Sequence, residues 1–78
     1  MRKKELRAVF TFQSTTSAMA MEKLCKERKM EGRLIPVPTS ITAGCGLAWR
    51  TNLQAKEALI QLMEDQQIEY DEVYELEI

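Results

Sequence analysis

The sequence contains no histidine, the side chain that most often acts as a general acid or base near neutral pH and that commonly binds zinc. Cysteine is also scarce. Cys25 and Cys45 are the only two, and they form neither a Cys-x-x-Cys zinc motif nor the dense disulfide framework of a small secreted protein. Histidine-assisted catalysis and a His/Cys zinc site are therefore excluded, and we expect neither a metal nor an organic cofactor.

Long apolar runs are lacking as well. No stretch approaches the roughly 18 apolar residues that a membrane-spanning helix needs, and the charged start, Met-Arg-Lys-Lys-Glu-Leu-Arg, lacks the apolar centre of a secretory signal. Proline and glycine number only two and three, and no linker rich in Pro, Gly or Ser divides the 78 residues. We therefore expect a cytoplasmic protein without a membrane partner, folded as a single domain over residues 1–78.

The charges are nearly balanced but segregated along the chain. The formal net charge is -1, yet residues 1–50 hold ten Lys/Arg and four Asp/Glu, whereas residues 51–78 hold one and eight. Such a dipole can steer a charged partner, although most charges on a small domain simply face solvent.

Apolar and polar residues alternate from Leu6 to Phe12, which is typical of a strand with one buried face. The Ser/Thr-rich stretch Gln13–Thr16 that follows predicts the N-terminus of a helix. The helical pattern continues until Gly32, which we expect to end it. Its apolar positions are Ala18, Met21, Leu24 and Cys25.

The second half of the chain predicts two strands, a second helix and a last strand, in that order. Residues 33–38 predict a short strand that should lie at a sheet edge, because Pro36 cannot donate to a ladder. Residues 45–50 predict another strand. Thr51 and Asn52 are expected to cap a second helix, and residues 68–78 predict a last strand with edge-protecting glutamates. The apolar positions of the second helix are Ala55, Ala58, Leu59, Leu62 and Met63.

Two right-handed crossovers around a central hairpin indicate an α+β fold, the ferredoxin-like β-α-β-β-α-β sandwich. Its four-stranded antiparallel sheet has the order 4-1-3-2, and both helices lie on one face. The edge strands would allow sheet-to-sheet dimers without requiring them. We expect one core between sheet and helices that contains Phe10, Leu24, Leu47, Leu59 and Leu62.

The chemically distinctive point of the sequence is Cys45, between two glycines in the loop from Thr39 to Leu47. In this topology the end of the first strand, the start of the first helix and this loop meet at one end of the sheet. The unpaired N–H groups of a first helical turn favour anions, and they can lower the pKa of a nearby thiol. The candidate site consists of Cys45 with Ser14, Thr15, Thr16, Gly44 and Gly46.

A second interpretation of Cys45 stays open, in which it is a small buried hydrophobe and its glycines form a tight turn. Cys25 lies on the apolar stripe of the first helix and is expected in the core. A disulfide between the two is excluded by length, because Cys25 lies about 15 Å along the helix and bridged Cα atoms lie within about 7 Å. Arg50 is expected as a surface charge at the strand end.

The stretch Pro36-Val-Pro-Thr-Ser-Ile-Thr-Ala-Gly-Cys-Gly-Leu-Ala-Trp-Arg50 resembles a family of small bacterial proteins of unknown function described as selenium/sulfur carrier-like. The likeness spans nearly the whole chain. Its most specific part is Pro-x-Pro, then Ser, then Cys-Gly-Leu-Ala-x-Arg. The resemblance implies that Cys45 accepts sulfur or selenium as a persulfide or perselenide, from a donor protein and for an acceptor protein. The Cys-Pro motif of better understood small sulfur-transfer proteins is absent.

Three functions remain in competition. The first is a thiol carrier or adapter acting through Cys45, which is a carrier rather than a stand-alone enzyme. The second is a regulatory module of the same fold that binds a small anion or a protein, with Cys45 as packing. The third, RNA binding through Phe10, Phe12 and Trp49, is disfavoured because the sequence pI is near 5.4 and these aromatics are expected in the core.

Overall fold

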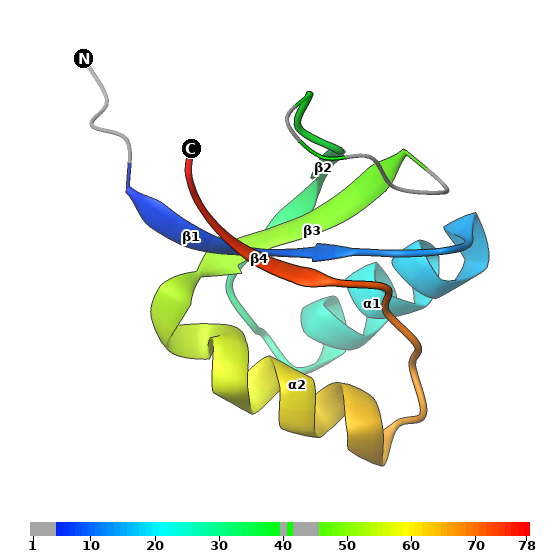
Figure 1. The fold of residues 1–78 in the computed structure, drawn as a ribbon. Coiled ribbons are helices and arrows are strands. Elements are labelled where there is room, and N and C mark those ends of the chain that lie inside the picture. The colour runs from blue at the N-terminus through cyan, green and yellow to red at the C-terminus, as the bar shows by residue number, and fades with distance from the viewer. Residues whose placement is uncertain (1–4, 40, 42–45) are drawn as a thin grey trace.

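The computed structural model describes residues 5–39, 41 and 46–78, which form a four-stranded antiparallel sheet with two helices on one face (Figure 1). The sheet order is β2-β3-β1-β4. This is the predicted β-α-β-β-α-β topology, so the expected ferredoxin-like fold is confirmed. In chain order the elements are β1 Leu6–Thr11, α1 Thr15–Glu27, β2 Arg33–Pro36, β3 Leu47–Asn52, the 3₁₀ turn η1 Leu53–Ala55, α2 Lys56–Asp65 and β4 Val73–Glu77.

The strand boundaries differ from the predicted ones most clearly in β2, β3 and β4. β2 ends at Pro36 rather than at residue 38, and β4 begins at Val73 rather than at residue 68. β3 continues to Asn52, so Thr51 is a buried strand residue and not a helix cap. Asn52 does cap, as expected, because its side-chain oxygen accepts a hydrogen bond from the Ala55 N–H at 2.8 Å. Asn52 thereby caps the 3₁₀ turn η1, and α2 begins directly after η1.

The end of α1 corrects the expectation that Gly32 stops this helix. α1 ends at Glu27, and the Met30 N–H donates to the Cys25 carbonyl at 2.8 Å while the Lys29 N–H donates to the Lys26 carbonyl at 3.3 Å. These two bonds form the Schellman motif, which satisfies the last carbonyls of a helix. Gly32 lies beyond it, in the turn that leads to β2.

Gly32 is required for a different reason, the close approach of Trp49. Its φ of +132° is a conformation that residues with a side chain rarely adopt. A Cβ atom there would also lie 2.6 Å from the Trp49 indole nitrogen and 2.6 Å from the Arg50 carbonyl oxygen. The glycine therefore lets the turn after α1 pack directly on β3.

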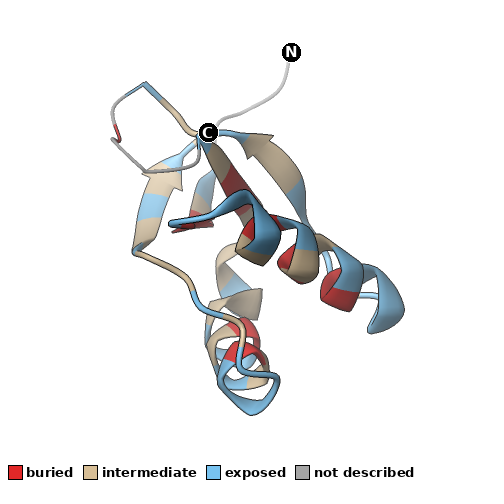
Figure 2. Ribbon diagram, turned by 90° about the vertical axis from the view of Figure 1, so that its right-hand side faces the viewer, coloured by how far each residue is buried: buried red, intermediate tan, exposed pale blue. Residues whose placement is uncertain are grey.

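The main core lies between the sheet and the helices. Phe10 and Leu59 are fully buried in it, and Leu47 and Leu62 pack against it. Leu24 is buried as well. Figure 2 shows buried residues concentrated in the middle of the sheet and recurring along both helices. The buried members of this cluster are Ala8, Phe10, Phe12, Ala18, Met21, Cys25, Trp49, Leu59 and Met63.

The aromatic residues that were weighed for RNA binding belong to this main core. Phe10 and Phe12 have no exposed surface, and Trp49 is 2% exposed. The Phe10 ring packs edge-on against Tyr70 with ring centroids 5.5 Å apart. Because an aromatic ring must be exposed to stack on a base, these three residues are unavailable for that function.

A second, smaller apolar cluster lies on the opposite face of the sheet, which is covered by neither helix of the described residues. Val9, Ala48 and Ile41 are buried in it. The alternation of β1 predicted one buried face, but Val9 is as inaccessible as Phe10, and Thr11 is only 1% exposed. Partly buried residues packed against this cluster are Ile35, Val37, Tyr74, Leu76 and Ile78.

Candidate functional site

The end of β1, the start of α1 and the start of β3 meet at one end of the sheet, as the topology predicted (Figure 1). In the register of the central pair, Thr11 at the end of β1 lies opposite Ala48, the second residue of β3. Gly46 immediately precedes β3 and therefore belongs to this end of the molecule. Cys45 and Gly44 lie outside the described residues.

The start of α1 is built as a capped helix terminus. The Ser14 hydroxyl oxygen accepts a hydrogen bond from the Ser17 N–H at 3.2 Å, and the Ser14 carbonyl accepts one from Ala18 at 3.3 Å. Thr15 and Thr16 form the exposed first turn. Since the cap occupies the Ser17 N–H, the N–H groups of the two threonines point toward the open end of the helix.

Gly46 anchors the second end of the β2–β3 connection. Its carbonyl accepts a hydrogen bond from the Val37 N–H at 3.0 Å, which extends the β2–β3 ladder by one pair beyond Pro36 and Leu47. Its φ of +77° lies in the left-handed region that favours glycine. A Cβ atom at this position would contact no other residue within 4 Å, so the backbone angle rather than crowding explains the glycine.

Two acidic residues that the sequence did not single out, Asp71 and Glu72, lie at the same end, on the β4 side of β1. The Gln13 amide donates to Asp71 at 2.8 Å, and the Asp71 N–H donates to the Thr11 carbonyl at 2.7 Å. The Thr11 N–H donates to the Glu72 carbonyl at 2.9 Å, and the Thr11 hydroxyl accepts from the Glu72 N–H at 3.1 Å. The approach to β4 is therefore fastened to the end of β1.

Cys25 lies in the main core, as the sequence predicted. It is 1% exposed, and its sulfur lies 4.0 Å from the Met21 sulfur. Burial away from water raises the pKa of the Cys25 thiol to about 11, because the thiolate would lose its hydration. Cys25 is therefore protonated and sterically protected at neutral pH.

Arg50 does not lie at the strand end, which corrects the expectation. It lies inside β3, opposite Val9 on one side and Arg33 on the other, and it is partly buried. Its place in the middle strand shows that it helps to build the sheet rather than to form the tip of a strand.

No group of three or more His, Cys, Asp or Glu side chains among the described residues is arranged to hold a metal ion. In the same part of the chain, neither helix has the length and apolar character to cross a membrane.

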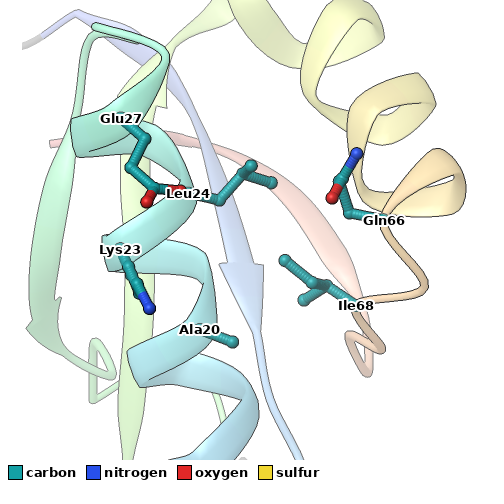
Figure 3. A pocket seen from close by; sticks show the side chains of 6 residues that line it. All are labelled: Ala20, Lys23, Leu24, Glu27, Gln66 and Ile68. Atoms are coloured by element: carbon teal, nitrogen blue, oxygen red, sulfur yellow. The ribbon is translucent and has the colours of Figure 1, made fainter.

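A cleft lies on the helical side of the molecule, between α1 and the end of α2 (Figure 3). Leu24 and Ile68 form its apolar floor, and Lys23 and Glu27 project from α1 beside it. Of the predicted site residues that the structure describes, Ser14, Thr15, Thr16 and Gly46, none lines this cleft. The lining residues are Ala20, Lys23, Leu24, Glu27, Gln66 and Ile68.

Comparison with known proteins gives one result. A protein-family model described as "Putative Se/S carrier protein-like" matches residues 7–75, which span all four strands and both helices except for the ends of β1 and β4. Searches of curated proteins and of solved structures each found no match. Because the family model covers most of the chain, this protein belongs to the Se/S carrier protein-like family.

Proposed function

We propose that this protein carries sulfur or selenium on Cys45, as a persulfide or a perselenide. The observation that carries the proposal is the burial of Cys25. The chain has two cysteines, and Cys25 is 1% exposed with its pKa raised to about 11. In a member of a carrier-like family whose other thiol is buried and protonated, the carrier role falls to Cys45.

The proposed transfer is an exchange at sulfur. The thiolate of Cys45 attacks the terminal sulfur of a donor persulfide, R–S–SH. A new S–S bond forms at Cys45 as the donor's S–S bond breaks, and the donor leaves as the thiolate R–S⁻. The transferred atom keeps its proton, and no net oxidation occurs. A selenium atom would move in the same way from R–S–SeH, and an acceptor protein would remove it by a second exchange.

Two described features support a reactive thiol at position 45. The exposed Gly46 leaves space beside it, because nothing lies within 4 Å of a Cβ there. The first turn of α1 presents unpaired N–H groups at the same end of the sheet. A helix end stabilises a nearby anion by about 0.3 to 1 kcal/mol, which lowers a thiol pKa by less than about one unit.

The test is sulfur loading followed by mass spectrometry. Protein purified without reductant is treated with inorganic polysulfide, desalted and digested. We expect a mass gain of one sulfur atom on the peptide that contains Cys45, and none on the peptide that contains Cys25. The matched variants are Cys25→Ala, which should load like the unchanged protein, and Cys45→Ala, which should not load.

A folded protein that takes up no sulfur on Cys45 would overturn the carrier function. The regulatory module that binds a ligand or a partner protein would then be the better account of the fold, with Cys45 as a packing residue. Loading on Cys25 instead would show that the main core opens under native conditions, which also contradicts the proposal.

A further inference from the structure

β4 forms one edge of the sheet and contains no proline (Figure 1). The Ile78 N–H donates to the Glu5 carbonyl at 3.1 Å, and the Thr11 N–H donates to the Glu72 carbonyl at 2.9 Å. In an antiparallel pair, residues that bond to the neighbouring strand alternate with residues that face away from it. The even-numbered residues of β4 therefore bond to β1, and the odd-numbered ones turn their N–H and C=O groups to the free edge. These outward residues are Val73, Glu75 and Glu77.

The opposite edge of the sheet, β2, is closed to further pairing by Pro36. The Val37 N–H donates to the Gly46 carbonyl at 3.0 Å, so the odd-numbered residues of β2 face β3, and Leu34 and Pro36 face outward. Proline has no N–H to donate. Leu34 is therefore the one outward donor within β2, whereas all three outward residues of β4 can donate. Of these two edges, β4 is the one that an added strand can use along its whole length.

The side chains of β4 give its two faces different chemistry. Tyr74 and Leu76 pack with the smaller apolar cluster, on the face away from the helices. Glu75 and Glu77 alternate with them on the helix side, and both are exposed. Glu75 forms an ion pair with Lys56 at 2.8 Å, whereas Glu77 has no cationic partner in the part of the chain that the structure describes. Lys56 is also the only Lys or Arg in residues 51–78, against eight Asp/Glu, so the sequence around this edge is acidic.

These charges oppose the pairing of β4 with a second copy of itself. The register that pairs all of β4 with another β4 puts the two copies of Glu75 opposite each other, and like charges directly opposite destabilise a sheet. Charged side chains on edge strands commonly protect against such pairing. A strand with cations opposite Glu75 and Glu77 would instead be favoured by the same carboxylates.

We propose that the free edge of β4 binds an extended segment of a partner protein in which Lys or Arg alternates with apolar residues. The segment adds a fifth strand, antiparallel to β4, and its main chain bonds to the outward N–H and C=O groups. Its cations lie opposite Glu75 and Glu77. Because side chains alternate between the faces of a sheet, its apolar residues then extend the face formed by Tyr74 and Leu76. This inference does not depend on the role of Cys45.

The experiment titrates the full chain into a fluorescein-labelled peptide in which lysine and valine alternate over seven residues, and fluorescence anisotropy measures binding. A block peptide has the same composition, but its three valines are adjacent. It should bind at least about fivefold more weakly, because it cannot place one lysine opposite each glutamate while its main chain bonds to β4.

Backbone methylation of the alternating peptide tests the main-chain bonds. In the proposed arrangement the lysine N–H groups face β4 and the valine N–H groups face away. Methylation of the lysine backbone nitrogens should weaken binding at least about tenfold, whereas methylation of the valine backbone nitrogens should change it little. Amide hydrogen exchange locates the contact. The alternating peptide should slow exchange at the outward residues of β4 and not at Leu34 of β2.

The charge contribution is tested with two variants of the chain. Glu77→Gln should weaken binding of the alternating peptide by about 1.5- to 5-fold, which is the effect of one cross-strand charge pair. The matched control is Glu27→Gln, which removes one exposed carboxylate from α1, the helix that packs on β3 and β2. The control should leave the affinity unchanged. Circular dichroism confirms that both variants are folded.

Failure of the alternating peptide to bind would overturn the proposal. Equal binding of the alternating and block peptides, or equal losses in Glu77→Gln and Glu27→Gln, would also overturn it, because the interaction would then be a general attraction between a cationic peptide and an acidic surface. Binding without slower exchange at Val73, Glu75 and Glu77 would place the peptide elsewhere, with the same consequence. Sulfur loading of Cys45 tests the carrier function separately, so the two proposals can fail independently.

Discussion

Lys29 and Gln67 adopt the left-handed backbone conformation although neither is glycine, with φ values of 55° and 57°. Each comes directly after the C-cap residue of its helix, which is Arg28 for α1 and Gln66 for α2. The Ile68 N–H donates to the Met63 carbonyl at 2.9 Å after α2, which matches the bond from Met30 to Cys25 after α1. Both helices thus end in a Schellman motif whose left-handed residue carries a long side chain. That conformation costs about 1 to 2 kcal/mol in a residue with a Cβ atom.

The first stability prediction follows from this strain. Gln67→Gly should raise the free energy of unfolding by about 0.5 to 1 kcal/mol, because relief of the strain exceeds the entropy that glycine loses on folding. The control is Gln66→Gly at the preceding residue, whose φ of -95° suits any side chain. It should lower the free energy of unfolding by about 0.5 to 1 kcal/mol. Urea denaturation measures both, and equal signs would contradict the explanation.

The helix ends show why sequence patterns located α1 only in part. Its start was predictable, because Ser14 is a good N-cap residue and does accept the Ser17 N–H. Its end was assigned to Gly32, because glycine is the usual residue in the left-handed position. Lys29 occupies that position instead. A strained lysine leaves no mark in the composition of a sequence, and only the backbone angles reveal it.

Among the elements, α2 shows how a helix is attached on more than one side. Leu59 and Met63 are fully buried against the sheet, and the Lys56 ammonium group forms an ion pair with Glu75 of β4 at 2.8 Å. The two side chains keep 27% and 45% of their surface exposed, and ion pairs that water can reach contribute little to stability. The apolar contacts must therefore supply most of the attachment of α2.

The second stability prediction tests this division. Leu59→Ala should lower the free energy of unfolding by about 2 to 5 kcal/mol, the usual range for opening a cavity in a packed core. Gln61→Ala is the matched control on the exposed side of the same helix, and its effect should stay within about 0.5 kcal/mol. Chemical denaturation of both variants measures the two changes in the free energy of unfolding. A loss below about 0.5 kcal/mol for Leu59→Ala would show that α2 does not depend on this contact.

Periodicity predicted the elements with a buried face better than the segments between them. The alternation in β1 and the helical spacing in α2 assigned Phe10 and Leu59 to one core, as observed. Residues 68–72 were assigned to β4, but Asp71 and Glu72 instead bond to the backbone and hydroxyl of Thr11. These bonds join residues about sixty positions apart, and no local pattern encodes them.

At the scale of the whole molecule, the sheet is buried on both sides. The helices cover one face, and Ile41 with its neighbours covers the other. The sequence indicated the first layer, because helices have a period that can be recognised. It did not indicate the second, because a single isoleucine in a loop has no period. The same limit applies to the site. Sequence reasoning assigned Cys25 to the core through the helical period of α1, whereas the loop that contains Cys45 has no period from which its surroundings could be predicted.

The buried thiol of Cys25 also links the stability of the whole fold to pH. Its pKa rises from 9.0 to about 11 on folding, so the folded state keeps a proton that the unfolded state releases between these two values. Stability falls with rising pH wherever the unfolded state binds fewer protons than the folded state. The contribution is fully present below about pH 9 and is lost as the pH rises to about 11.

The last prediction is that the chain loses about 2 to 3 kcal/mol of its free energy of unfolding between pH 9 and pH 11 through this thiol. Cys25→Ala should be less stable at neutral pH because of its small cavity, but it should lack this part of the alkaline loss. The hydrogen bond to Glu75 raises the pKa of Lys56. This effect is common to both proteins, so it cancels when the free energy of unfolding of the variant is subtracted from that of the unchanged chain. Urea denaturation at several pH values gives the two curves. If they stay parallel up to pH 11, Cys25 ionises as readily in the folded protein as in the unfolded chain, and the main core does not exclude water from its sulfur.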